Sequence, residues 1–353
     1  MRIAYLTGIR QLELCEVAAP EKPSDGVLVR MDRVGVCGSD VHYYLHGRIG
    51  NQVVEYPATV GHECSGTVLQ VSPAVTHLRP GDRVAIDPAI VCGHCDQCRA
   101  GRVNTCRNIQ FMGVPGQAPG AAVDYYVLPA ENCFRLPDSL SLDIGALAEP
   151  LSIGLYAMQL GQVGQRSKLA VLGTGPIGLS VLLCAAAAGA QCCYATDLID
   201  RRLEVARRCG AHWTGNPRSE DVVEVILARE PEGLDVVFEC SGDPACMDQA
   251  QELLTPGGTL VIVGIPPTVQ VSFDTHKMRV KELTFKACRR QRGCVGPAIS
   301  LVEQGRIDPT PLLTHRFALD RIGEAFELVA GYRDGVIKAV LDLSVEGPSQ
   351  RGG

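Results

Sequence analysis

The stretch KLAVLGTGPIG, residues 168–178, decides the fold of the second half of the chain. Five strand-like residues lead into Gly173, Gly175 and Gly178, which are spaced G-x-G-x-x-G, and the helix-like run PIGLSVLLCAAAAG follows at once. Glycines at this spacing allow a tight turn and let backbone N–H groups approach a pyrophosphate, which sits at the positive end of the helix dipole. The stretch therefore predicts a strand, a phosphate-binding turn and a helix in direct succession.

An acidic residue ends the next apolar segment, QCCYATD, where Asp197 lies nineteen residues after Gly178. At this distance a carboxylate accepts hydrogen bonds from the adenosine ribose of NAD, although it could also do no more than cap a turn. Arg201 and Arg202 follow closely, and arginines here neutralise the extra phosphate of NADP in some enzymes. We give Asp197 more weight than the two arginines and therefore expect NAD as the cofactor.

The sequence around this turn alternates strands and helices, whereas the sequence before it does not. After residue 152, six apolar strand-like segments are separated by amphipathic helices such as DRRLEVARRCG, the pattern of a doubly wound parallel sheet. Before residue 150, short strands such as GVLVRMDRVGVCG are separated by Pro-Gly and Gly-Asp breaks. The fold class is α/β, and we expect three parts: a mostly β domain over 1–151, a Rossmann-type domain over 152–290, and a return to the first domain over 291–353. The last eight residues, EGPSQRGG, are expected to be disordered.

Composition limits the kinds of partner that the chain can have. Its 353 residues are 46% hydrophobic and 20% charged, enough for two domains with their own cores, and the formal net charge is −6. No block of lysine and arginine is present, so neither nucleic acid nor an anionic membrane is expected as a partner. The N-terminus lacks a signal-peptide pattern, and the apolar run 179–190 is too short to cross a bilayer. We expect a cytoplasmic protein that acts on a small molecule.

Four of the sixteen cysteines lie within VCGHCDQCRAGRVNTC, residues 91–106. They are Cys92, Cys95, Cys98 and Cys106, spaced C-x2-C-x2-C-x7-C. A long, unexported chain does not need a disulfide framework, whereas four thiolates form a closed structural zinc site with no position left for substrate. An iron–sulfur or rubredoxin-like centre could use the same ligands, but the spacing favours zinc. We interpret the lobe, residues 91–107, as a structural brace.

A second set of metal-binding residue types lies in the first domain. Cys37 and the pair His62-Glu63 each stand at the end of a strand-like run beside glycine, and Glu149 lies at the domain junction in ALAEPLS. A single cysteine or histidine is more often an inert core residue. Together these four offer a thiolate, an imidazole and two carboxylates, and three such ligands with a water define an open, catalytic zinc site. We therefore expect two zinc ions per chain.

Five of these segments occur in the same order in zinc-dependent medium-chain alcohol dehydrogenases, which the chain resembles over about residues 2–342. They are CGSDVHYYLHGRIG, GHECSG, the four-cysteine lobe, ALAEPLS and GTGPIG. Within that family the first and fourth segments look like the polyol (sorbitol, xylitol) dehydrogenase branch, as does THRFALDRIGEAFE near the C-terminus. The resemblance implies a GroES-like catalytic domain interrupted by a Rossmann domain, and a homo-oligomer, either tetramer or dimer.

The resemblance also implies roles for individual residues. Cys37, His62 and Glu63 match the catalytic zinc ligands, and Glu149 matches the remaining ligand, which binds directly or through water. Ser39 matches the proton-relay hydroxyl, and His42 a relay histidine of some members. The residues expected to line the substrate pocket are Tyr43, Phe111, Glu149, Arg289 and Arg290, the last standing where tyrosine is common. The residues expected to bind the cofactor are Gly173, Gly175, Pro176, Ile177, Gly178, Asp197, Arg202, Val263, Gly264, Ile265 and Arg289.

The expected reaction is hydride transfer from a secondary alcohol of a polyol or vicinal diol to NAD, giving a ketone or ketose. Zinc would lower the pKa of the alcohol hydroxyl, and Ser39 would pass its proton outward. An L-threonine 3-dehydrogenase or a butanediol dehydrogenase is the main alternative, since those branches also carry all four lobe cysteines. A non-catalytic, crystallin-like dinucleotide-binding protein is the remote one.

Overall fold

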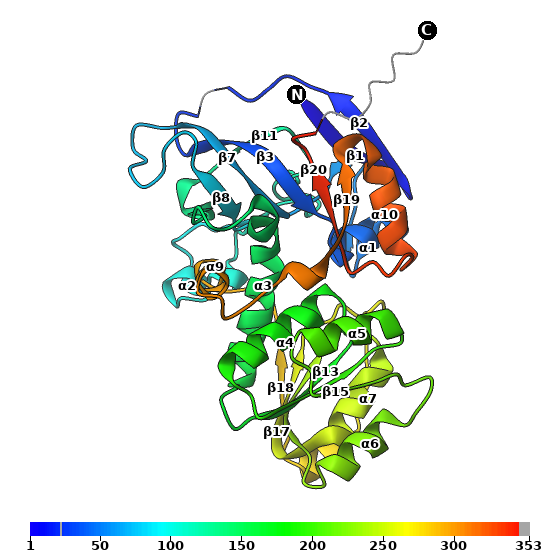
Figure 1. Cartoon of the computed structure of the whole chain (residues 1–353). Coiled ribbons are helices and arrows are strands. Elements are labelled where there is room, and N and C mark those ends of the chain that lie inside the picture. The colour runs from blue at the N-terminus through cyan, green and yellow to red at the C-terminus, as the bar shows by residue number, and fades with distance from the viewer. Residues whose placement is uncertain (22, 346–353) are drawn as a thin grey trace. The chain divides into compact units, whose positions relative to one another are not determined.

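Six parallel strands form the sheet of the second half of the chain, in the order β15-β14-β13-β16-β17-β18 (Figure 1). Their bounds are β13 (Lys168–Leu172), β14 (Cys192–Thr196), β15 (Trp213–Gly215), β16 (Leu234–Glu239), β17 (Leu254–Ile262) and β18 (Thr284–Ala287). The helices that connect them are α4 (Pro176–Ala188), α5 (Asp200–Arg208), α6 (Val222–Arg229), α7 (Pro244–Leu253) and α8 (Thr275–Val280). The strand order reverses between β13 and β16, as in a doubly wound sheet. The predicted Rossmann-type sheet is confirmed.

Local sequence explains where the helix after β13 begins and ends. Pro176 occupies the first turn of α4, where its missing N–H costs no hydrogen bond, and Gly189 ends the helix in the left-handed region at φ 73°. Residues 178–185 of α4 are buried, which explains why the helix is apolar on all sides. The glycine-rich turn is thus held between two buried elements.

A seven-stranded sheet organises the other, mostly β half of the fold, which contains strands from both ends of the chain. Its strand order is β12-β8-β7-β3-β20-β19, with β11 paired to β3. Its strands are β3 (Val27–Gly35), β7 (Glu63–Val71), β8 (Arg83–Ile86), β11 (Tyr125–Leu128), β12 (Cys133–Arg135), β19 (Leu313–Ala318) and β20 (Lys338–Asp342). A smaller sheet contains β1 (Arg2–Gly8), β2 (Gln11–Glu16) and β6 (Ala58–Thr59), and short pairs join β4 (Arg48–Ile49) to β5 (Gln52–Val53) and β9 (Ala89–Ile90) to β10 (Gln110–Phe111). The helices with this sheet are α1 (Gly38–His46), α2 (Asp96–Arg99) and α10 (Ile322–Ala330). This half is mostly β, as expected.

The computed structural model describes residues 1–21 and 23–345, so the disorder expected for residues 346–353 lies outside the described residues. The chain divides into two compact units: the first contains Met1–Glu149 and the chain from Leu313 onward, and the second contains Pro150–Leu312. The first boundary falls within helix α3 (Leu142–Gly161), two residues before the expected one. Nothing in the described part of the chain is a helix long and apolar enough to cross a membrane.

The second boundary differs from the expected return at residue 291, because the chain rejoins the first unit only at Leu313. The intervening helix α9 (Val295–Glu303) buries Val295 and Ala298, and Arg306 donates to the carbonyl of Ala187 at 2.6 Å, which ties this segment to α4. A completed six-stranded sheet therefore does not end the second unit; one more helix packs with it.

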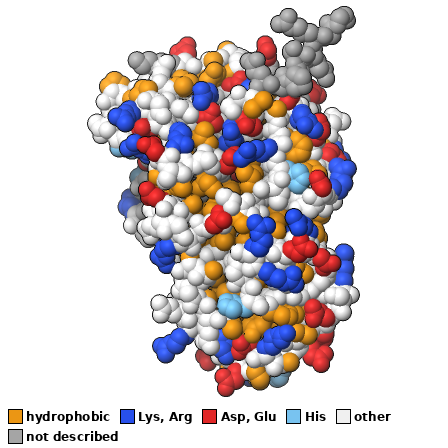
Figure 2. All heavy atoms as spheres, viewed as in Figure 1, with side chains coloured by type: hydrophobic (Ala, Val, Ile, Leu, Met, Phe, Trp, Pro, Cys, Tyr) orange, Lys and Arg blue, Asp and Glu red, His pale blue; other side chains and the backbone are white. Residues whose placement is uncertain are grey.

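Acidic and basic side chains are interspersed over the visible face of the molecule (Figure 2). Apolar atoms lie among them in small groups on both units. On this face the two signs of charge are therefore mixed, and no single acidic field is visible.

Candidate active site and metal centres

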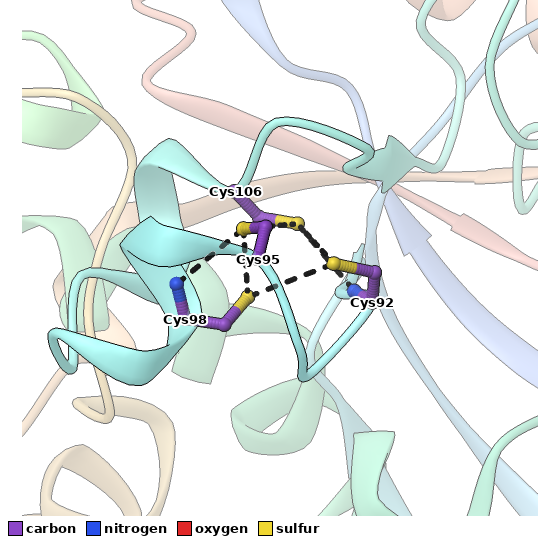
Figure 3. A group of neighbouring side chains, drawn as sticks. All are labelled: Cys92, Cys95, Cys98 and Cys106. Carbon is purple, nitrogen blue, oxygen red and sulfur yellow. Dashed lines mark hydrogen bonds between the residues drawn. The ribbon is translucent and has the colours of Figure 1, made fainter.

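The four lobe cysteines point toward one another around a common centre (Figure 3). The Sγ–Sγ distances are 3.5 Å for Cys95–Cys98 and Cys92–Cys106, 3.9 Å for Cys95–Cys106 and 4.0 Å for Cys92–Cys98. A zinc ion with four sulfurs at about 2.3 Å in tetrahedral geometry separates the sulfurs by about 3.8 Å. The spacing therefore fits a zinc ion of the closed, structural kind.

Backbone hydrogen bonds favour the thiolate form at two of the four lobe cysteines. A backbone hydrogen bond from His94 lowers the pKa of Cys92 to about 6, and one from Arg107 lowers the pKa of Cys95. Burial and the neighbouring thiols raise the pKa of Cys98 to about 12, an effect that a cation among the four sulfurs would offset. Asp96 pairs with Arg107 through two hydrogen bonds of 2.5 and 2.8 Å, which closes the lobe on its outer side.

A second group of candidate ligands is formed by Cys37, His62 and Glu63, whose ligand atoms all lie within 4.8 Å of one another. Cys37 is the N-cap of α1 just after β3, and Glu63 begins β7 opposite Gly35 of β3. A Cβ at residue 35 would lie 2.2 Å from Glu63 Oε2, so the glycine makes room for the carboxylate. Adjacent strand ends thus bring the three predicted ligands together.

Asp40, a residue that is 1% exposed, orients the His62 ring through the ring's Nδ1 atom. The His62 Nδ1 atom lies 3.5 Å from Asp40 Oδ2, and the other Asp40 oxygen accepts a hydrogen bond from the Gly61 N–H at 3.2 Å. This arrangement leaves Nε2 as the atom that can bind a metal. Burial acts to lower the pKa of His62, but Asp40 and Cys37 outweigh it and raise the pKa well above its ordinary value. The site is built for a positive charge.

Glu63 pairs with a lysine that sequence reasoning did not single out. Lys338 Nζ lies 2.6 Å from both carboxylate oxygens of Glu63 and donates to the Val36 carbonyl at 3.2 Å, and both side chains are 1% exposed. A carboxylate has enough lone pairs to accept from the ammonium and still bind a metal. The signal for Lys338 in the sequence is weak: a lysine stands directly before the apolar residues AVL of the predicted strand KAVLDLS.

Glu149 is buried in α3 but is not a member of the three-residue group. Burial raises the pKa of Glu149 to about 7, with a further increase from Glu63 and opposing effects from His62 and Lys338. Its carboxyl group is therefore electrostatically coupled to the cluster. That Glu149 is the remaining metal ligand, directly or through water, stays a prediction.

The other predicted residues of the first unit lie on α1 or beside His62. Ser39 Oγ donates to Cys37 Sγ at 3.4 Å, and His42 lies on the next turn of α1, where burial, followed by the nearby His46, lowers its pKa. The ring of Phe111 lies 5.4 Å from that of His62, and the Tyr43 hydroxyl donates to Gln52 Oε1 at 3.3 Å. Gln52 was also absent from the sequence-based set.

The residues predicted to bind the nucleotide lie in the second unit. Gly173 has φ 93°, and a Cβ at residue 178 would lie 1.9 Å from the Gly173 carbonyl oxygen, so neither position accepts another residue without strain. Asp197 accepts hydrogen bonds from the backbone N–H groups of Thr174 at 2.7 Å and Ile199 at 3.0 Å. The turn and the acid are therefore joined directly, as dinucleotide binding requires.

The two arginines near Asp197 have different surroundings. Arg202 Nη1 lies 3.8 Å from Asp197 Oδ2, and a Cβ at Gly175 would lie 3.7 Å from the same nitrogen, which places Arg202 at the turn. Arg201 instead pairs with Glu204 at 2.6 Å on the surface. In the same unit, Arg289 is exposed after β18, and Arg290 is half-buried with φ 53°.

The glycine-rich turn, the acid that is hydrogen-bonded to it and the two groups of candidate metal ligands are the features expected of a zinc-dependent dehydrogenase. The chain belongs to the zinc-dependent alcohol dehydrogenase family: residues 23–138 match the alcohol dehydrogenase GroES-like domain, and residues 176–304 match the zinc-binding dehydrogenase domain. The resemblance seen in the sequence motifs is thereby confirmed.

Among individual relatives, the sorbitol dehydrogenase of Bacillus subtilis (strain 168) is 34% identical over 342 residues, covering 97% of each chain. The sorbitol dehydrogenase of Gallus gallus is 41% identical over 314 residues, 87% of each chain. The crystal structure of 2R,3R-butanediol dehydrogenase from Bacillus subtilis superposes with a TM-score of 0.88 at 31% identity, covering 97% of this chain and 99% of that one.

Proposed function

We propose that this protein is a zinc-containing, NAD-dependent dehydrogenase that oxidises a secondary alcohol of a polyol or vicinal diol to a ketone or ketose. The observation that carries the proposal is the group of Cys37, His62 and Glu63, because one thiolate, one imidazole and one carboxylate leave a tetrahedral ion one open position. The similarity to sorbitol and butanediol dehydrogenases supports the substrate class.

The residues that would hold the catalytic zinc are Cys37, His62 and Glu63, with Glu149 direct or through water. When bound there, zinc supplies a Lewis acid that lowers the pKa of a substrate hydroxyl toward neutrality. Asp40 keeps His62 Nδ1 engaged, so that the ring presents Nε2, and Lys338 fixes both oxygens of Glu63. The chain itself thus sets the orientation of two of the three ligands.

Proton removal falls to side chains of α1. The Ser39 hydroxyl, which lies beside Cys37, can accept the alcohol proton at Oγ while donating its own. His42, one turn further along the helix, has a pKa lowered by burial, so that its ring is neutral near pH 7 and can take the proton onward. A bound nicotinamide would supply the acceptor for the carbon-bound hydrogen and its electron pair, so that the alcohol would be oxidised by two electrons.

The NAD preference rests on Asp197. Its carboxylate is held at the glycine-rich turn by Thr174 and Ile199, where it can accept hydrogen bonds from ribose hydroxyls and repel a 2′-phosphate. Arg202 lies close enough to pair with such a phosphate, and it is already within 3.8 Å of the acid. We propose that the acid prevails.

The substrate is proposed to be an uncharged polyol or vicinal diol. Arg289 can donate several hydrogen bonds to hydroxyl groups, and the neighbouring Arg290 and Arg292 disfavour the ammonium group of an amino alcohol such as L-threonine. We further propose that the lobe holds a second, structural zinc, and that the chain is a cytoplasmic homo-oligomer, dimeric or tetrameric.

A substrate and cofactor panel tests the function. The purified enzyme is assayed with sorbitol, xylitol, 2,3-butanediol and L-threonine, each with NAD and with NADP, and we expect the highest kcat/KM for a polyol or diol with NAD. Cys37→Ser should abolish turnover while the circular dichroism spectrum is kept. The control Cys15→Ser, which changes a thiol outside both clusters, should leave turnover unchanged. A clear preference for L-threonine would reject the proposed substrate class, and turnover by Cys37→Ser would reject the site.

A further inference from the structure

A buried carboxylate stands at the point where the strand order of the second unit reverses. Glu239 is the last residue of β16 and pairs with Leu172, the residue before the glycine-rich turn. Its side chain is completely buried. In a doubly wound sheet this is where the dinucleotide crosses between the two halves of the strand ends. The role of a charge in this place is not explained by the residues predicted to bind the nucleotide.

One oxygen of Glu239 organises the loop that follows β16. Oε1 accepts hydrogen bonds from the Ser241 N–H at 2.7 Å, the Ser241 hydroxyl at 2.6 Å and the Gly242 N–H at 2.7 Å. The same hydroxyl accepts from the Asp243 N–H at 2.9 Å, and Asp243 is the N-cap of α7. The carboxylate therefore fixes the whole path from β16 into α7.

This loop is in turn packed between the two neighbouring strand ends. A Cβ at Gly173 would lie 2.7 Å from the Ser241 nitrogen, and a Cβ at Gly242 would lie 2.5 Å from the Ile265 carbonyl oxygen. On the other side, a Cβ at Gly264 would lie 2.6 Å from Glu239 Oε2. Three glycines thus let the backbone close around one carboxylate, and any shift of the loop must move Gly264 and Ile265.

The backbone of Glu239 holds the same neighbours. Its carbonyl oxygen accepts from the N–H groups of Val263 at 2.8 Å and Gly264 at 2.9 Å. Asp197 and the first glycines serve the adenosine half, so the ends of β16 and β17 are left for the nicotinamide half. Both the backbone and the side chain of Glu239 therefore support the nicotinamide side.

We infer that Glu239 is a positioning residue for the nicotinamide half of the bound cofactor, acting through the Ser241–Gly242 loop on Gly264 and Ile265. The inference rests on the proposed use of NAD. It assigns Glu239 no contact with substrate or with reacting atoms. Its expected signature is a loss of affinity for the complete dinucleotide that is larger than the loss for its adenosine half.

The test is calorimetric binding of NAD and of ADP to the holoenzyme. Glu239→Ala should raise the Kd for NAD roughly tenfold or more, because three donors of the Ser241–Gly242 loop lose their acceptor, and should change the Kd for ADP by less than about threefold. Glu239→Gln keeps an oxygen for the three donors and should stay within about threefold of the wild type for both. Gln251→Ala is the matched control, because Gln251 is a buried polar residue of α7 whose side-chain amide donates to the Met247 carbonyl in the same helix.

A second variant covers the case in which Glu239→Ala does not fold. Ser241→Ala removes the hydroxyl that links Oε1 to Asp243 and should weaken NAD a few-fold while ADP binding is kept. An unchanged NAD affinity in folded Glu239→Ala or Ser241→Ala, or equal losses for NAD and ADP in these two variants, would overturn the inference. If the wild type itself binds no NAD, the proposed function fails instead, so the two failures are distinguishable.

Discussion

Asp197 is the residue on which cofactor choice should turn. Asp197→Asn removes the charge but keeps the size and an acceptor for the Thr174 N–H. We expect the ratio of kcat/KM with NADP to that with NAD to rise, because the repulsion of a 2′-phosphate is gone and Arg202 lies within 3.8 Å. The loss of a charged hydrogen bond to the ribose should cost NAD binding roughly 1–3 kcal/mol.

The control for this change is Asp200→Asn, which alters an exposed acid in the first turn of α5. It should leave the ratio as in the wild type. Steady-state kinetics with both cofactors give the result. If the unmodified enzyme already used NADP as well as NAD, the arginines and not the acid would set the preference.

Some residues of the candidate site could be read from the sequence, and others could not. The glycines of the turn and the candidate metal ligands could be recognised from the sequence. Their spacing, and the cysteine, histidine and glutamate residue types, are rare outside nucleotide-binding and metal sites. Lys338, Asp40 and Glu239 are common residue types in ordinary contexts. Their importance comes from what lies across from them in space, as with Lys338 and Glu63, which are separated by 275 positions in the chain.

At the scale of elements, the four-cysteine lobe is expected to stabilise and not to catalyse. Cys95→Ser should lower the melting temperature by roughly 5–10 °C, as the loss of a few kcal/mol does in a domain of this size, because metal binding is coupled to folding. The folded fraction should still turn over substrate. Differential scanning calorimetry and a specific-activity assay measure the two effects.

The comparison variant is Cys246→Ser, since Cys246 belongs to neither metal-binding cluster. It should melt close to the wild type. A Cys95→Ser protein that keeps the wild-type melting temperature, or that is folded and inactive, would contradict the structural role of the lobe.

The contact between α1, α10 and the turn after β1 provides a pH-dependent test. Arg10 donates to both oxygens of Glu327, at 3.0 and 2.5 Å, and the buried Tyr44 hydroxyl donates to the same carboxylate at 2.7 Å. Arg10, followed by Tyr44, lowers the pKa of Glu327. A lowered folded-state pKa contributes stability above the unfolded value of about 4.3, and this stability is lost as the pH falls through the lowered pKa.

We therefore expect Glu327→Gln to lower the free energy of unfolding by about 1 kcal/mol at pH 7, a modest value because the ion pair is partly exposed. The difference from the wild type should shrink below about pH 4, when the wild-type carboxyl is also protonated. Urea unfolding of both proteins at the two pH values measures this difference in free energy of unfolding. The variant Tyr44→Phe measures the separate contribution of the Tyr44 hydroxyl. A difference that grew at low pH would refute the assignment.

For the whole molecule, the periodicity of the second half was enough to predict the six-stranded sheet, because helices and strands alternate there without interruption. The point of return to the first unit was not predictable in the same way. Residues 291–312 carry an amphipathic helix that could cover either unit, and only its packing, such as the bond from Arg306 to Ala187, decides the matter.

The metal content of the whole chain is expected to be two zinc ions. Elemental analysis of active protein should give two per chain, and Cys37→Ser or Cys95→Ser should each give one, since each variant damages a different cluster. Circular dichroism checks that both variants are folded. One zinc or none in fully active wild-type enzyme would show that one of the clusters does not hold this metal.

The pairing of Lys338 with Glu63 also has a consequence for synthesis on the ribosome. The lysine that donates to the Val36 carbonyl follows it by 302 positions, and the whole second unit is translated in between. At translation rates of roughly 5–20 residues per second, on the order of 15–60 s pass between the synthesis of Glu63 and that of Lys338. The nascent chain therefore contains the whole second unit before β20 can be added to the sheet of the first unit and bring Lys338 to Glu63.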